Sequence, residues 1–144
     1  MLAVSDPVRR ECGFARIGAN PQRRPFRASA ELYFAAGSAS ACGVVPVPPG
    51  KSLVIEQAVG EGFLPMGQVC VFSVLTPELG ALVGVQEAVH ASREEHDQLR
   101  YCRASATMRL CAEGGAKVTL RADRDVARGE AHLRMSISGY QLEE

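Results

Sequence analysis

The chain has 144 residues, 47% of them hydrophobic, and its 16 basic and 16 acidic side chains give a formal net charge of zero. This length is enough to bury one substantial core, so we expect a single domain. The neutral balance argues against general electrostatic attraction to nucleic acid or to acidic membranes. No stretch approaches the roughly 20 apolar residues of a membrane-spanning helix, so we expect no membrane partner.

The N-terminal segment and the cysteines together predict a reduced, cytoplasmic protein. Residues 1–20 lack the apolar core of a secretory signal. The number of cysteines is odd and no two form a close C-x-x-C pair, which favours neither a disulfide framework nor a zinc site. We therefore expect free thiols at Cys12, Cys42, Cys70, Cys102 and Cys111.

Residues 1–27 differ in composition from the rest of the chain. They contain six arginines and three prolines and show little periodicity. Such a segment is typical of an arm, either flexible or wrapped around a domain. We therefore divide the chain into an arginine-rich N-terminal arm, 1–27, and a β-sandwich domain, 28–144.

From residue 28 onward, short apolar segments alternate with turn residues. The turn Pro46–Gly50 precedes an apolar segment, and residues 131–140 alternate between apolar and polar side chains, which places one face in a core. Many short strands with turn signals between them predict an antiparallel β-sandwich, jelly-roll-like, of about eight or nine strands. We expect strands over 28–36, 42–47, 52–59, 68–76, 81–90, 98–103, 105–112, 116–123 and 130–142.

Two segments depart from simple alternation. The segment 68–76 has apolar residues on both faces, which is typical of a central strand or of a strand at a subunit contact. Ser92 and Glu95 fit a capping box and predict a short helical turn over 93–98.

The C-terminal third predicts two hairpins. A turn at 113–116 would place Leu110 opposite Val118, and a second turn at 123–129 keeps apolar residues on the same face. A slip of one residue would destroy this agreement. The second connection is also long enough to cross between two sheets.

The opposite face of these hairpins carries a cationic patch. Arginine side chains bind carboxylate, sulfate or phosphate through two parallel hydrogen bonds, so the patch is a candidate site for an anionic or sugar ligand. The alternative is a solvated sheet face whose charges discourage aggregation. The patch consists of Arg109, Lys117, Arg121, His132 and Arg134.

A second candidate site is metal-binding. His90, His96 and His132, with the carboxylates of Glu94 and Glu95, are the residue types that bind transition metals. A cupin-like enzyme would gather such ligands inside a barrel. No His-x-His pair is present, and the alternative is a solvated polar loop.

The segments 45–56 and 137–140 resemble those of small, functionally uncharacterised bacterial β-sandwich proteins. The likeness consists of a VPxGKxLVIE turn-strand and an SGYL-like final strand, and it covers residues 44–142. It implies a β-sandwich and brings no catalytic residues.

These patterns favour a non-catalytic binding or assembly module. It would self-associate as a homo-oligomer through a sheet face or through the strand 68–76, with no cofactor and no nucleic-acid partner. The alternatives are the cupin-like metal-dependent enzyme and an anion-binding or glycan-binding β-sandwich.

Overall fold

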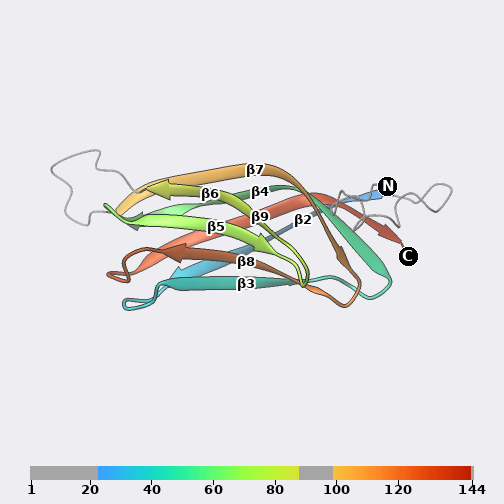
Figure 1. The fold of residues 1–144 in the computed structure, drawn as a ribbon, viewed down its shortest axis with the longest axis horizontal. Helices are drawn as coiled ribbons and strands as arrows, with labels where there is room; N and C mark the ends of the chain where they lie inside the picture. Colours follow the sequence, from blue (N-terminus) through green and yellow to red (C-terminus); the bar gives the residue numbers. More distant parts are fainter. Residues whose placement is uncertain (1–22, 88–98, 144) are drawn as a thin grey trace.

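The computed structural model describes residues 23–87 and 99–143, which form a sandwich of two four-stranded antiparallel sheets (Figure 1). Alternating apolar residues produce it, since each sheet buries one face against the other. No helix among these residues is long and apolar enough to cross a membrane. The strands are β2 (Arg23–Phe34), β3 (Ser40–Pro46), β4 (Lys51–Pro65), β5 (Val69–Leu75), β6 (Gly80–Glu87), β7 (Leu99–Glu113), β8 (Lys117–Arg124) and β9 (Ala131–Glu143).

The strands pair in a nested order. The first sheet has the order β2-β9-β4-β7 and the second has the order β3-β8-β5-β6. Thus β2 pairs with β9, β3 with β8, β4 with β7 and β5 with β6, as though one long hairpin closing between β5 and β6 had been rolled up. All of these pairs are antiparallel.

Both predicted C-terminal hairpins are wrong. β7 and β9 belong to the first sheet and β8 to the second, so each connection crosses between sheets. Leu110 and Val118 are both buried in the core, but they enter it from opposite sheets. The same inward alternation satisfies either arrangement, and it therefore could not identify the neighbour of each strand.

The strand boundaries need two further corrections. The segments predicted as separate strands, 98–103 and 105–112, form the single strand β7. β2 begins at Arg23, inside the range assigned to the arm. The predicted helical turn at 93–98 and most of the arm lie outside the described residues.

The core between the sheets consists of large side chains that are fully buried. Each contributes about 1.5–3 kcal/mol relative to an exposed position. The ring of Phe72 on β5 packs directly over Gly60 on β4, where a Cβ would lie 2.3 Å from the ring. Other fully buried side chains are Phe34, Leu53, Leu120, Leu133 and Met135.

A second cluster of buried residues lies on the outward side of the first sheet, next to a β-bulge in β4 between Ile55 and Gln57. The guanidinium of Arg23 lies 4.5 Å from the centre of the Tyr140 ring in this cluster. Cys111, another member, is disulfide-bonded, so the expectation of a free thiol is wrong at this residue. Cys42, Cys70 and Cys102 are free.

Replacing Gly60 with alanine tests the contact between the sheets. We expect Gly60→Ala to lower the free energy of unfolding by about 1–3 kcal/mol, because the added methyl group overpacks the core against Phe72. Chemical denaturation measures this change. Combining Gly60→Ala with Phe72→Leu should cost less than the sum of the single changes. Strictly additive effects would show that this contact does not limit the spacing of the sheets.

Candidate functional site

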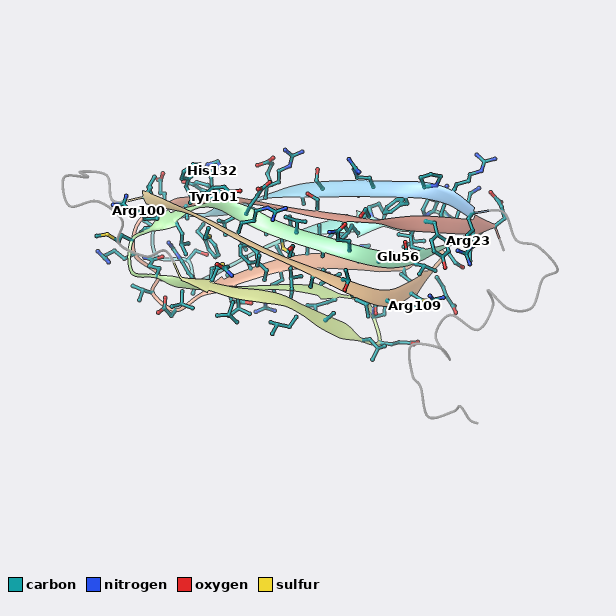
Figure 2. All side chains as sticks on the ribbon, turned by 90° about the horizontal axis from the view of Figure 1, so that it is seen from above. Arg23, Glu56, Arg100, Tyr101, Arg109 and His132 are labelled. Carbon is teal, nitrogen blue, oxygen red and sulfur yellow. The ribbon has the colours of Figure 1, made fainter. Side chains whose placement is uncertain are left out.

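The predicted cationic patch is divided between opposite faces of the molecule. Arg109, His132 and Arg134 lie on the outer face of the first sheet, whereas Lys117 and Arg121 lie on β8 in the second sheet. Even within the first sheet, Arg109 and His132 lie toward opposite ends (Figure 2). The patch fails as one site because β8 crosses to the other sheet.

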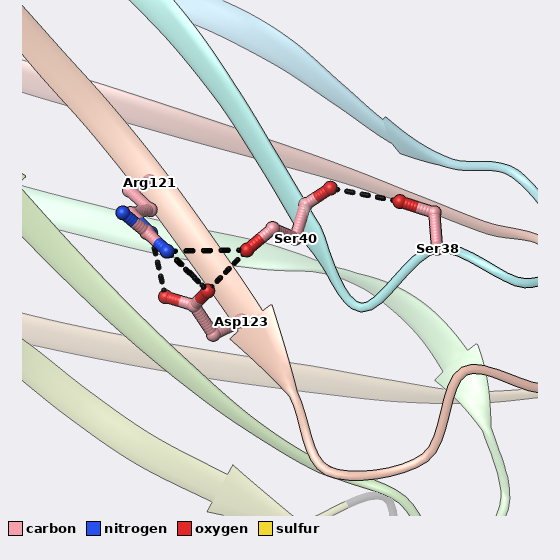
Figure 3. Close-up of polar contacts among 4 residues, drawn as sticks. All are labelled: Ser38, Ser40, Arg121 and Asp123. Atoms are coloured by element: carbon pink, nitrogen blue, oxygen red, sulfur yellow. Dashed lines mark hydrogen bonds and ion pairs between the residues drawn. The ribbon is translucent and has the colours of Figure 1, made fainter.

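Arg121 is already bound to a carboxylate of its own chain (Figure 3). Its Nε atom donates to Oδ2 of Asp123 at 2.9 Å, and its Nη2 atom donates to Oδ1 at 3.1 Å. The hydroxyl of Ser40 on β3 donates to the same carboxylate at 2.5 Å. Burial raises the pKa of Asp123, but the hydrogen bonds from Arg121 and Ser40 outweigh burial and lower it overall. The Arg121 guanidinium is therefore engaged within the chain.

Among residues 23–87 and 99–143, the buried cation is Arg124, which the strand prediction for 116–123 did not include. Only 5% of its surface is exposed. Its guanidinium donates to Gln68 Oε1 and lies 4.7 Å from the centre of the Phe34 ring. Burial lowers the pKa of Arg124, yet an arginine remains charged in proteins. It also donates to the carbonyl oxygens of Ala35, Ser38, Arg128 and Gly129.

The outer face of the first sheet carries an aromatic row at the end next to Arg124. Cross-strand register places one ring on each of the four strands: Tyr33 pairs with His132, His132 with Phe63, and Phe63 with Tyr101. Tyr33, Phe63 and Tyr101 are 46%, 51% and 53% exposed. The Tyr33 and His132 centroids are 4.7 Å apart, and those of Phe63 and Tyr101 are 5.6 Å apart. Tyr101 and His132 lie together in Figure 2.

A charged row runs beside the aromatic row, and on each strand its residue lies two positions from the aromatic one. Arg134 Nε lies 3.7 Å from Glu31 Oε2, and Arg103 Nε lies 3.7 Å from Glu61 Oε1. The Tyr101 hydroxyl donates to Glu61 at 2.5 Å, and this hydrogen bond, with a smaller effect of burial, raises the pKa of Tyr101. In order across β2, β9, β4 and β7, the charged row is Glu31, Arg134, Glu61 and Arg103.

A shallow hollow of about 250 Å³ opens on the same face beyond the charged row. It lies next to Glu61 and Arg103 and is lined also by Arg27, Gln57 and Ser136. This lining offers hydrogen-bond donors and acceptors, and its charged groups are two guanidinium groups and one carboxylate.

The second sheet has a different outer face around β5 and β6. Val71 pairs with Val85 and Ser73 with Leu82 across these strands. Leu82 is 61% exposed and Val85 52%, and Val71 is half-buried. We call Val71, Leu75, Leu82 and Val85 the β5–β6 patch.

Of the residues proposed to bind a metal ion, the structure describes only His132. His132 stacks edge-on against Tyr33 in the aromatic row. Residues 23–87 and 99–143 contain no group of three side chains that could hold a metal ion. His90 and His96 lie outside these ranges, so the hypothesis remains untested.

The buried thiols are poor nucleophiles. Burial, with a smaller repulsion from Cys102 and Asp123, raises the pKa of Cys70 to about 12. Burial also raises the pKa of Cys102. A thiol must lose its proton to attack, so both side chains pack as small hydrophobic groups.

No protein-family model matches this chain, and no curated protein matches it. Three solved structures show weak likenesses. The core of Drosophila NLP, described in terms of pentamer formation and histone binding, shares 18% identity over 80% of this chain and 98% of its own, with a TM-score of 0.34. The VP2 subviral particle of infectious bursal disease virus shares 11% identity over 88% of this chain and 33% of its own, with a TM-score of 0.36.

The third structure is a CocE/NonD family hydrolase from Staphylococcus aureus, which shares 6% identity over 87% of this chain and 37% of its own, with a TM-score of 0.39. This chain thus spans about a third of the viral and hydrolase chains. The three likenesses assign neither a family nor a function. The resemblance to bacterial β-sandwich proteins stays a prediction.

Replacing Arg124 tests whether it holds one end of the sandwich together. We expect Arg124→Lys to lower the free energy of unfolding by about 3–5 kcal/mol, because an ammonium group cannot satisfy the carbonyl oxygens that the guanidinium binds. Thermal and chemical denaturation measure the loss. The matched change at exposed Arg109, Arg109→Lys, should stay within about 0.5 kcal/mol. Equal effects at the two positions would contradict this role.

The pKa of Asp123 predicts a dependence of stability on pH. Because folding lowers this pKa, the contribution is complete above the unfolded value of 3.8 and is lost as the pH falls through the folded value. We expect Asp123→Asn to reduce the loss of stability between about pH 4 and pH 2. Denaturation midpoints across this range measure the slope. An unchanged slope in the variant would show that another group is responsible.

Proposed function

We propose that this protein is a non-catalytic assembly module that forms homo-oligomers through the β5–β6 patch. The observation that carries the proposal is that β5 is apolar on both faces. Its inner residues Cys70, Phe72 and Val74 are fully buried, while its outer residue Val71 lies beside the exposed Val85. Contiguous exposed apolar surface of this kind marks interaction sites on soluble proteins.

The nested strand pairing supports a jelly-roll-like interpretation of the sandwich, in which two Greek keys are wound together. Such a scaffold leaves the outer face of each sheet available for contacts. The raised thiol pKa values and the engagement of Arg121 with Asp123 agree with a non-catalytic role.

A pair of matched valines tests this function. Val85 and Val44 are equally exposed, at 52% and 51%, on the same sheet, but Val44 lies on β3 at the opposite edge. We expect Val85→Glu to reduce the oligomer mass in sedimentation velocity, because a carboxylate would have to be desolvated at the contact. Val44→Glu should leave the mass unchanged.

One result would overturn the proposal. If Val85→Glu and Val44→Glu both have the same mass as the wild type in sedimentation velocity, the chain does not self-associate through this patch. Circular dichroism of each variant establishes that the fold is intact.

A further inference from the structure

The charged row on the first sheet has a symmetry that the sequence does not reveal. Its signs alternate across the four strands, negative on β2 and β4 and positive on β9 and β7. Reversing the order of an alternating row of four exchanges every negative position for a positive one. A row with this property is complementary to its own reversed copy.

We propose that the outer face of the first sheet binds the same face of a second copy of this chain. The two-fold axis would run parallel to the strands, between β9 and β4. This operation places β2 of one copy over β7 of the other, and β9 over β4. Glu31 then faces Arg103, and Arg134 faces Glu61, so all four contacts join opposite charges.

The charges also select this axis over its alternative. A two-fold axis running along the row would place each residue over its own copy, Glu31 over Glu31 and Arg134 over Arg134. Such contacts between like charges are destabilising. Aligned sheets cross at about 30°, so the pairs nearest the axis remain opposed most closely. These are the two contacts between Arg134 and Glu61.

The aromatic row follows the same operation. Tyr33 would lie over Tyr101, and His132 over Phe63. About half the surface of each of the three larger rings is exposed in the single chain and would be buried at the contact. Tyrosine and phenylalanine supply large contact areas and are enriched at the centres of protein interfaces.

The next row allows the two faces to approach. It consists of the small side chains Ser29, Ser136, Val59 and Ser105, one on each strand. Four strands are about 19 Å wide, and the seven residues 27–33 of β2, which lie beyond the buried cluster around Tyr140, extend about 23 Å. This exposed part of the face therefore offers roughly 440 Å², about half the ~800 Å² per partner of a standard interface.

A second copy fits this face better than other ligands. The row has equal numbers of opposite charges, so it lacks the positive excess that binds nucleic acid or anions. The aromatic rings pack edge to face, at interplanar angles of 61° and 62°, and so do not form the flat platform on which a sugar ring stacks.

This contact is independent of the β5–β6 patch, because the two surfaces lie on opposite sheets. One contact alone gives a dimer. Because the two axes then lie on opposite sides of the sandwich and do not meet, both contacts together would stack copies into an open filament.

Charge reversal with complementation tests the proposal in the full chain. In an Arg134→Glu homodimer both central contacts would join two carboxylates, and in a Glu61→Arg homodimer both would join two guanidinium groups. We expect each variant to self-associate about 10- to 100-fold more weakly than the wild type, measured by sedimentation equilibrium. Lys117→Glu reverses a charge on the second sheet and should have no effect.

Mixing the two variants restores opposite charges at both central contacts. We expect a heterodimer of Arg134→Glu and Glu61→Arg chains, which native mass spectrometry detects by its distinct mass. An effect confined to the fold of each chain cannot produce this recovery. Both variants should retain wild-type circular dichroism spectra.

Three results would overturn this inference. The variants could self-associate as strongly as the wild type, or the mixture could give no heterodimer. The third is a chain that stays monomeric while it binds oligosaccharides on a glycan array. Failure of the proposed function is distinguishable. In that case Val85→Glu leaves the dimer intact, and Arg134→Glu alone dissociates it.

Discussion

A single buried guanidinium fixes one end of the sandwich. Arg124 lies at the end of β8, and its donors reach the β2–β3 connection, the β4–β5 connection and the β8–β9 connection. Loops that meet at the end of a sandwich leave carbonyl oxygens turned inward, and each unsatisfied oxygen would cost about 1–3 kcal/mol. One fork-shaped cation satisfies several of them at once. The aromatic row begins next to this arrangement, since Tyr33 is the immediate neighbour of Phe34, whose ring contacts the Arg124 guanidinium.

Alternation in the sequence was sufficient to predict the sandwich but not its pairing. The apolar positions of segments such as 131–140 identify which residues point inward. They do not identify whether two inward faces lie side by side in one sheet or oppose each other across the core. Leu110 and Val118 illustrate this limit, because both point into the core as predicted although the hairpin that would join them does not exist.

The same limit explains what was predicted of the surfaces. The outward direction of Arg109, Arg121 and Arg134 followed from alternation, whereas their division between two sheets depended on β8 crossing over. The aromatic row joins positions 33, 63, 101 and 132, which are far apart in the sequence and meet through the register of four strands. A bulge in β4 changes that register further along the same strand. The apolar character of the segment 68–76 was visible directly, because it resides in consecutive residues.

The nested pairing has a consequence for how the chain folds. Among the paired strands, only β5 and β6 are neighbours in the sequence, while Arg23 at the start of β2 pairs with Leu142 near the end of the chain. Closing such long loops loses entropy before the contacts repay it, and topologies of high contact order fold in milliseconds to seconds. Pairing that starts at β5–β6 can grow outward in short steps, with β2–β9 closing last. The central strand β9 then enters the first sheet only when nearly the whole chain is in place, so the surface on which the aromatic and charged rows stand is the last part of the molecule to form.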